Sequence, residues 1–254
     1  MIVLRPSRGW IYFLSIHSRS LKGVSETPLK PADCQHIIKK AAKMSSAMHS
    51  GGGHNAFNII LLGNSGTGKS ASGNTLLNAG THQSRPAQHF FSYPSSTPVT
   101  TKCEEITVKM FERLVRVVDT PDFFYEDQPV DEEEIKACKQ YCKSRQHVIL
   151  LVIQLGRFTD GEAGILEKLE NKFGRISDRT IILFTHGENL HCDVKQFIGE
   201  RIHLKHIVEA CGGRYHVFKN TSKNSRQVKE LIETFEYMFP GFRTKESFPL
   251  FCCG

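Results

Sequence analysis

The sequence predicts an α/β fold in which a mostly parallel central sheet has helices on both faces. Strand-like and helix-like apolar segments alternate between about residues 56 and 239, and this alternation indicates βαβ units. The longest apolar run, residues 147–155, contains no Lys, Arg, Asp or Glu, as expected of a strand buried on both faces of such a sheet. This run is too short to span a bilayer as a helix.

The local pattern predicts each element in turn. A strand at 57–62 ends in a glycine-rich turn, and a helix begins at Lys69 and continues to residue 78. The later elements are strands at 105–111 and 114–118, forming a hairpin, a helix at 131–144, a strand at 148–154, a helix at 162–173, a strand at 180–184, a helix at 193–211, a strand at 215–218 and a helix at 225–239. The acidic run 131–134 suits the N-terminus of the helix at 131–144. Gly212 and Gly213 are expected to end the helix at 193–211.

The chain length of 254 residues fits one domain with tails. We expect a non-globular N-terminal extension (1–55), one domain (56–239) and a C-terminal tail (240–254). Residues 1–24 contain four Lys or Arg and no acidic residue, which weakly resembles a mitochondrial transit peptide. The glycine-rich segment 50–54 is expected to be a flexible joint before the domain.

Composition sets broad limits on the function. Hydrophobic residues make up 39% of the chain, which is enough for a sizeable core. The net charge of +7 favours anionic partners such as nucleotide, acidic proteins or anionic lipid, or simply keeps the protein soluble; no nucleic-acid partner is predicted. The eight cysteines include no CxxC pair, which argues against a zinc site and favours reduced thiols in a cytosolic protein.

The segment 63–70, GNSGTGKS, matches the phosphate-loop pattern GxxxxGK[ST] at every fixed position. It follows a predicted strand and opens a predicted helix, which is the context that this motif requires. Glycines let backbone N–H groups line a concave nest, and the helix N-terminus adds partial positive charge. Lys69 is expected to contact the β- and γ-phosphates, and the Ser70 hydroxyl to ligate Mg²⁺. The predicted nucleotide-binding residues here are Gly63, Asn64, Ser65, Gly66, Thr67, Gly68, Lys69, Ser70 and Ala71.

Two further segments are expected to reach the same site. Residues 78–98 include few aliphatic side chains, and loops of this length inside compact domains are usually functional or disordered. Thr100 and Thr101 follow, and either hydroxyl is suited to Mg²⁺ and the γ-phosphate. Asp119 ends an apolar strand, where a carboxylate is costly unless it holds a metal or hydrogen bonds. It is interpreted as a second Mg²⁺ residue, with a turn-capping aspartate as the alternative.

Together these motifs resemble the GIMAP family, the immunity-associated nucleotide-binding proteins, a septin-like branch of the P-loop GTPases. The resemblance covers about residues 56–239 and is carried by segments 63–77, 99–103, 119–123, 150–160, 183–186 and 210–220. Segment 150–160, LLVIQLGRFTD, resembles a box that is particular to this family. The fold expected is therefore a P-loop G domain.

The resemblance implies that GDP or GTP is the ligand, with Thr100 as the switch I threonine. It implies base contacts from His186, Asn189 and Asn220, although Asn220 is also consistent with a plain turn residue. It implies nucleotide-dependent self-association, as a homo- or hetero-oligomer, through the face that carries the base and the switches. In the family, the arginine matching Arg157 acts across a dimer on the partner's phosphates; the alternative for Arg157 is a plain surface residue.

Three departures from the family pattern affect the expected chemistry. Asp122 stands where other GTPases often have a glycine whose backbone N–H meets the γ-phosphate. Phe123 stands where many small GTPases have a glutamine that orients water. In the base motif, the family usually has aspartate at Asn189 and often lysine at Gly187, so base recognition is the weakest part of the match.

The C-terminal sequence FPLFCCG ends in tandem cysteines, Cys252 and Cys253. Lipid attachment at these cysteines would favour membrane association, and an unmodified apolar tail is the alternative. The family's links to lymphocyte survival and intracellular membranes imply a cytoplasmic protein that associates with such membranes.

The sequence thus predicts a GTPase switch that hydrolyses GTP slowly, with Lys69, Thr100 and Arg157 as catalytic residues and Ser70, Thr100 and Asp119 as Mg²⁺ ligands. A nucleotide-dependent membrane scaffold with little turnover is the alternative. A P-loop ATPase or kinase is disfavoured by the base motif and the family box.

Overall fold

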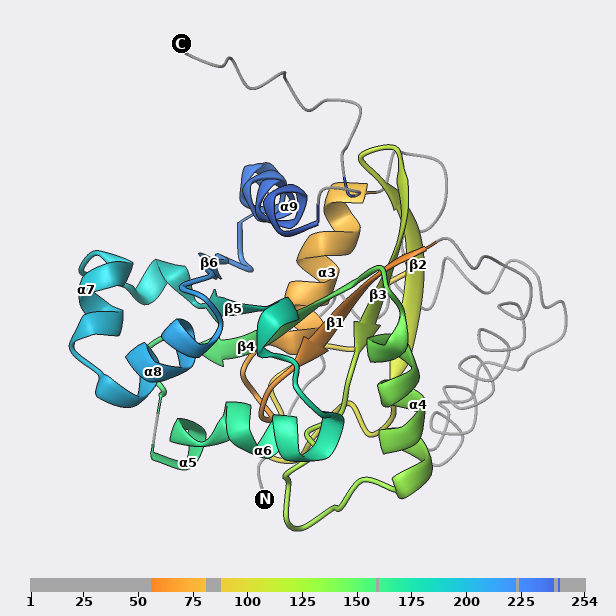
Figure 1. Ribbon diagram of the computed structural model, residues 1–254, viewed down its shortest axis with the longest axis horizontal. Helices are drawn as coiled ribbons and strands as arrows, with labels where there is room; N and C mark the ends of the chain where they lie inside the picture. Colours follow the sequence, from red (N-terminus) through yellow and green to blue (C-terminus); the bar gives the residue numbers. More distant parts are fainter. Residues whose placement is uncertain (1–55, 81–87, 159, 223, 240–241, 243–254) are drawn as a thin grey trace, which may run out of the picture. The chain divides into compact units, whose positions relative to one another are not determined.

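The computed structural model describes residues 56–80, 88–158, 160–222, 224–239 and 242 (Figure 1). The predicted N-terminal extension and the tail cysteines, Cys252 and Cys253, lie outside the described residues. None of the helices in the described part of the chain combines the length and the apolar character needed to cross a membrane.

A six-stranded sheet forms the centre of the domain, in the strand order β2-β3-β1-β4-β5-β6. The strands are β1 (Phe57–Leu62), β2 (Glu104–Met110), β3 (Arg113–Asp119), β4 (His147–Gln154), β5 (Thr180–Thr185) and β6 (Tyr215–Val217). β2 and β3 pair in antiparallel fashion, and every other neighbouring pair is parallel. The predicted fold class is therefore confirmed. Because the parallel strands all end at the same edge, the loops that follow them meet there.

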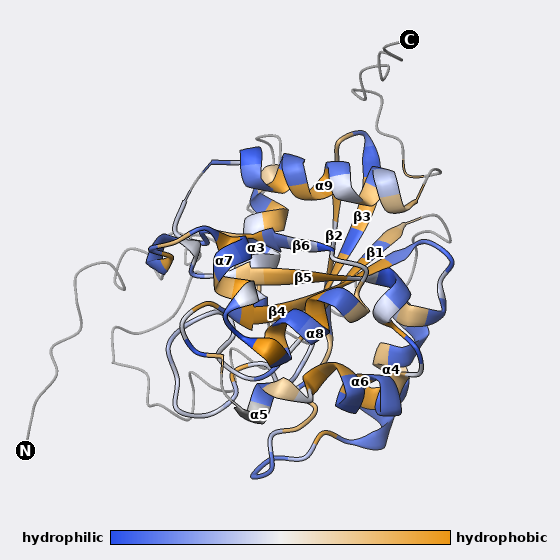
Figure 2. Ribbon diagram, turned by 60° about the vertical axis from the view of Figure 1, so that its left-hand side comes forward, coloured by the Kyte–Doolittle hydropathy of each residue, from blue (hydrophilic) through white to orange (hydrophobic). Residues whose placement is uncertain are grey.

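Helices cover both faces of this sheet (Figure 2). They are α3 (Lys69–Gly80), α4 (Glu132–Lys143), α5 (Asp160–Ala163), α6 (Ile165–Phe173), α7 (Val194–Gly199), α8 (Ile202–Ala210) and α9 (Arg226–Met238). Alternate residues of β1 show the division: Ile59 and Leu61 pack in the cluster with α3 and α9, whereas Ile60 and Leu62 pack with α4, α6, α7 and α8. These four side chains are 0% exposed, so β1 presents its phosphate loop from a rigid position.

The prediction of a single helix at 193–211 is wrong, because two helices, α7 and α8, occupy this stretch. Arg201 separates them with an extended backbone (φ −123°, ψ 98°). Its guanidinium donates a hydrogen bond to the carbonyl oxygen of Phe197 at 3.1 Å and stacks over the Phe197 ring. This side chain thus satisfies a carbonyl at the end of α7, where the helix leaves it without a backbone partner.

The helix predicted at 162–173 is also interrupted, at Gly164, between α5 and α6. Gly164 has φ −98° and ψ 11°, outside the range of a regular helix. Glycine costs helix stability at an interior position, which favours a break at this residue.

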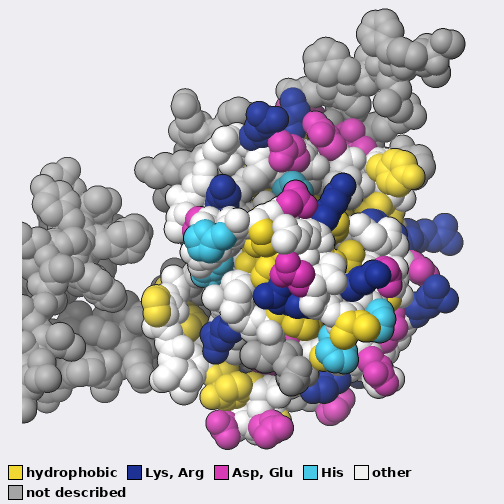
Figure 3. All heavy atoms as spheres, turned by 90° about the vertical axis from the view of Figure 1, so that its left-hand side faces the viewer, with side chains coloured by type: hydrophobic (Ala, Val, Ile, Leu, Met, Phe, Trp, Pro, Cys, Tyr) yellow, Lys and Arg dark blue, Asp and Glu magenta, His cyan; other side chains and the backbone are white. Residues whose placement is uncertain are grey.

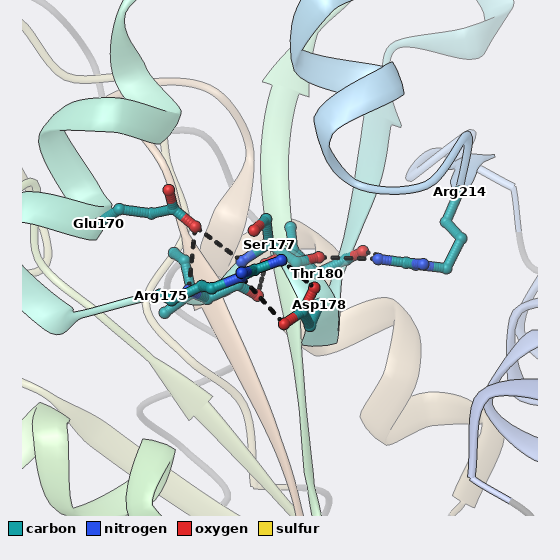
Figure 4. Close-up of polar contacts among 7 residues, drawn as sticks. Glu170, Arg175, Ser177, Asp178, Thr180 and Arg214 are labelled. Carbon is teal, nitrogen blue, oxygen red and sulfur yellow. Dashed lines mark hydrogen bonds and ion pairs between the residues drawn. The ribbon is translucent and has the colours of Figure 1, made fainter.

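The amino end of β5 is held by a polar network (Figure 4). The Glu170 carboxylate accepts hydrogen bonds from the backbone N–H groups of Ile176 and Ser177, at 3.1 and 3.0 Å. Arg214 donates to the carbonyl oxygens of Ser177 and Thr180, at 2.7 and 3.1 Å. These bonds join α6, β5 and the turn before β6, and they fix the strand that reaches the phosphate loop at its other end.

The packed domain extends beyond residue 239. Phe242 is 2% exposed, and its ring lies 4.3 Å from that of Phe57 on β1. The guanidinium of Arg113 lies 4.8 Å from the centre of the same ring. Phe242, which the sequence suggested as part of the tail, therefore belongs to the core between β1 and α9.

The face that carries α7 and α8 shows basic, acidic and hydrophobic side chains interspersed (Figure 3). No block of one charge covers this face, so the net positive charge does not by itself mark a binding surface here. The binding site has to be located from the loops at the carboxyl edge of the sheet.

Candidate nucleotide site

The loop between β1 and α3 turns on its glycines. Gly63 has φ +142°, and a Cβ at this position would lie 2.5 Å from the carbonyl oxygen of Val152 on β4. Gly66 and Gly68 also have positive φ values, of 77° and 95°. A side chain at Gly63 would require a strand to move, so glycine allows the loop to pass this close to the sheet.

Lys69 is held inside this loop. Its side chain is buried, and Nζ donates to the carbonyl oxygens of Gly63 and Asn64, each at 2.9 Å. Burial lowers the pKa of Lys69, and the negative charges of Asp119 and Asp122 oppose this shift. The loop backbone alone therefore holds the ammonium group in place, without a contribution from a phosphate.

Three side-chain oxygens converge beside Lys69. Ser70 Oγ donates to Asp119 Oδ2 at 2.6 Å, and Thr100 Oγ1 donates to the same oxygen at 3.1 Å. The two hydroxyl oxygens are 3.2 Å apart. Asp119 Oδ1 is buried and has no hydrogen-bond partner among the residues that the structure describes. Between the two adjacent threonines, the structure brings Thr100 to this point, whereas Thr101 is exposed.

This oxygen set fits Mg²⁺, which prefers hard oxygen ligands and uses few protein groups beside phosphate oxygens and water. Burial raises the pKa of Asp119, and the hydroxyls of Ser70 and Thr100 and the charge of Lys69 oppose the shift. A divalent cation would offset the same burial cost and give the orphaned Oδ1 a partner, directly or through water.

A cavity of about 460 Å³ opens over the loop and α3. Its lining residues are Ser65, Gly66, Gly68, Lys69, Ser70, Ala71, Phe91, Ser92, Tyr93, Pro94, Ser95, Thr97, Pro98, Val99, Thr100, Thr120, Asp122, Arg157 and His186. Arg157 is exposed, and its Nη1 would lie 3.4 Å from a Cβ on Gly66. Phe91 and Tyr93, which also line the cavity, are 59% and 61% exposed. The cavity thus combines the glycine loop and Lys69 with aromatic and basic side chains in its lining.

The segment after β5 forms the next part of the edge. Thr185 Oγ1 donates to the carbonyl oxygen of Thr67 at 2.7 Å, which ties this strand to the phosphate loop. His186 has a left-handed backbone (φ 57°) and lines the cavity.

Gly187 is buried, and a Cβ there would lie 2.6 Å from Val217 Cγ1. The structure therefore has no space for a lysine at this position unless Val217 moves. Asn189 is exposed.

Asn220 contacts α3. Its Oδ1 accepts a hydrogen bond from the Thr75 hydroxyl at 2.9 Å, and its Nδ2 donates to Ser72 Oγ at 3.1 Å. Both ends of this side-chain amide therefore bond to the helix that begins at the phosphate loop. In this arrangement Asn220 fixes the segment after β6 against α3, which accounts for its presence without a base contact.

Two sets of hydrogen bonds around the cavity had no clear signal in the sequence. The Asn74 side chain accepts from the Phe90 N–H at 2.8 Å and donates to the Phe90 carbonyl oxygen at 3.0 Å, so α3 holds the start of the cavity wall. The Asp122 carboxylate accepts from the Ser65 N–H.

Phe123 is 7% exposed and packs on Phe173 with ring centres 5.0 Å apart. It is a core residue that lacks any group to orient water.

The fold and the site together define a P-loop nucleotide-binding domain of the GTPase type. The AIG1 family model matches residues 57–241, and the chain belongs to the AIG1 family. Relatives include GTPase IMAP family member 8 from Mus musculus, 37% identical over 188 residues, which cover 69% of this chain and 26% of that protein. Immune-associated nucleotide-binding protein 8 from Arabidopsis thaliana is 31% identical over 199 residues, covering 72% of this chain and 54% of that protein.

The chain thus spans about a quarter to a half of the length of these relatives. Among solved structures, Toc33 from Arabidopsis thaliana in complex with Mg²⁺ and GMPPNP is similar with a TM-score of 0.48 and 17% identity, over 76% of this chain and 81% of that chain. A variant of Era from Aquifex aeolicus bound to GDP and AlF₄⁻ has a TM-score of 0.49 and 17% identity, over 78% and 60%.

Proposed function

We propose that this chain is a guanine-nucleotide switch that binds GDP and GTP with Mg²⁺, self-associates in the GTP state and hydrolyses GTP slowly. The observation that carries the proposal is the convergence of the buried Lys69 ammonium with the oxygens of Ser70, Thr100 and Asp119 at one end of a glycine loop. Phosphoryl-transfer sites use this combination of a lysine and metal-ligating oxygens to hold a nucleoside triphosphate.

The phosphate chain would lie over the loop at the N-terminus of α3. Backbone N–H groups of the loop and the helix dipole favour an anion there, and Lys69 supplies the full positive charge. Mg²⁺, when bound, would neutralise charge on the β- and γ-phosphates. Ser70, Thr100 and Asp119 would hold the ion, so their present mutual hydrogen bonds would be exchanged for metal contacts.

Slow turnover by a single protomer follows from the buried Phe123. Water attack on the γ-phosphate is usually aided by a residue that orients the water, and Phe123 is packed on Phe173 instead. Arg157, exposed at the cavity rim, is a further basic group, besides Lys69, that could stabilise charge on a phosphate. Exposed Phe91 and Tyr93 on the same rim are the residue types that interfaces favour, which supports self-association through this face.

The alternative is a nucleotide-dependent scaffold at a membrane with little or no turnover. Single-turnover GTP hydrolysis, measured at increasing protein concentration, separates the two functions. A specific rate that rises with concentration supports a GTPase activated by self-association. A rate that is negligible at every concentration supports the scaffold and contradicts the proposed hydrolysis.

Guanine recognition gives a separate prediction at Asn189. Guanine offers two adjacent donors, N1–H and the N2 amino group, and a carboxylate accepts both with charge assistance. Asparagine provides one acceptor oxygen and a mismatched amide NH₂. We expect Asn189→Asp to tighten GDP binding by roughly 1–3 kcal/mol, or about five- to 150-fold, and to raise the preference for guanine over xanthine, as measured by calorimetry with GDP and XDP.

The neighbouring exposed carboxylate, Glu188, serves as the matched control. Glu188→Gln should leave GDP affinity unchanged if Asn189 faces the base. If instead Asn189→Asp has no effect and Glu188→Gln weakens GDP binding, the base is read one residue earlier in the chain and the assignment of Asn189 is wrong.

A further inference from the structure

Asp122 stands where other GTPases often have glycine, and its carboxylate lies inside the phosphate site. The residue is 8% exposed, and Oδ2 accepts a hydrogen bond from the Ser65 N–H of the phosphate loop at 2.5 Å. Oδ1 accepts from the Phe124 N–H at 2.9 Å. One carboxylate therefore connects the phosphate loop to the loop that follows β3.

This carboxylate uses the groups that a nucleotide phosphate needs. Its negative charge acts on Lys69, the cation of the phosphate loop, and it occupies the N–H of Ser65. A carboxylate and a phosphate oxygen are both anionic acceptors of charge-assisted hydrogen bonds. They compete for the same donors and repel each other at close range.

The position of Asp122 relative to the metal ligands indicates which phosphate is affected. Asp122 lies in the loop after β3, three residues beyond Asp119, which is the last residue of that strand. Ser70, Thr100 and Asp119 are the residues that would hold Mg²⁺, and the ion would supply positive charge to the β- and γ-phosphates. The loop after β3 thus approaches from the γ-phosphate side, and GDP has no group that must enter there.

We propose that the Asp122 carboxylate is an internal competitor of the γ-phosphate, which biases this chain toward GDP over GTP and which GTP must displace from Ser65. This inference rests on the proposed function, because it assumes that the site takes guanine nucleotides. Displacement would also break the bond to Phe124, so GTP binding would loosen the loop after β3 at that residue.

Equilibrium binding of fluorescent GDP and of fluorescent GMPPNP, in Mg²⁺ buffer, tests the first part. The ratio of the two dissociation constants is compared for the wild-type chain, Asp122→Asn and Asp122→Gly. Both variants remove the charge, the first with little change of shape. We expect each to improve GMPPNP binding relative to GDP on the order of tenfold or more. Asp127→Asn, an exposed carboxylate in the same loop, controls for a general charge effect.

Two results would overturn the inference. One is an unchanged GMPPNP-to-GDP ratio in both Asp122 variants while GDP still binds; the other is an equal change in Asp127→Asn. If the wild-type chain binds neither nucleotide, the proposed function fails and this inference with it.

A measurement on the wild-type chain is independent of how the variants fold. Amide hydrogen exchange at Phe124 should be faster in the GMPPNP complex than in the GDP complex, because the carboxylate that accepts its N–H has moved. Equal protection in the two complexes would contradict displacement of Asp122.

Discussion

Lys69→Ala is expected to abolish measurable binding of GDP and GTP. Lys69 is the buried cation of the loop, with Nζ 2.9 Å from two loop carbonyl oxygens, and it is the cation placed at the centre of the proposed phosphate site. Removing one partner of a buried charge pair costs roughly 3–5 kcal/mol, or on the order of 10²- to 10⁴-fold in affinity. Calorimetric titration with GDP in Mg²⁺ buffer measures this loss.

Two further variants make the result specific. Lys69→Met keeps much of the buried volume without the charge, and it should lose binding to the same extent. Lys102→Ala removes an exposed lysine from the segment beside Thr100 and should retain GDP affinity. GDP affinity that is unchanged in Lys69→Ala would show that the nucleotide does not lie on this loop.

Arg157→Ala is expected to remove most of the GTP turnover that depends on protein concentration. The guanidinium is exposed beside Gly66 at the cavity rim, where a second protomer would meet it. Arginine fingers are worth about 10³- to 10⁵-fold in kcat, and the absence of a water-orienting group at Phe123 increases the dependence on such a group. We expect a loss of roughly 10³-fold at high protein concentration, with GDP binding retained.

The dependence on concentration distinguishes two ways in which Arg157 could act. A loss confined to high protein concentration supports action across an interface. The same fractional loss at every concentration would place Arg157 on the nucleotide of its own chain and contradict the role in self-association. Arg175→Ala, at the opposite end of the sheet in an exposed pair with Asp178, is the matched control and should turn over GTP like the wild type.

The overall fold could be predicted because the hydrophobic pattern of each segment agrees with the helix or strand that the segment forms. Buried parallel strands leave long apolar runs such as 147–155, and the phosphate-loop motif fixes both the strand before it and the helix after it. The breaks at Gly164 and Arg201 were harder to predict. Glycine is tolerated within some helices, and the cap at Arg201 depends on its side chain folding back onto Phe197.

The site was predictable where a motif fixes its members and less so where contacts join distant segments. Spacing alone places Lys69 and Ser70, but adjacent Thr100 and Thr101 have the same chemistry, and only the path of the chain selects one of them. The contact between Asp122 and Ser65 joins residues 57 positions apart. In the sequence its only sign is an aspartate at a position where glycine is common.

The proposed function requires residues 63–70 to hold a guanine nucleotide together with Mg²⁺. Calorimetric titration of the wild-type chain with GDP and with ADP, each with Mg²⁺ and with the ion chelated, tests it most directly. We expect GDP to bind, ADP to bind roughly tenfold or more weakly because base hydrogen bonds are lost, and chelation of Mg²⁺ to weaken GDP binding. Equal or tighter binding of ADP, or GDP binding that is indifferent to Mg²⁺, would contradict the claim.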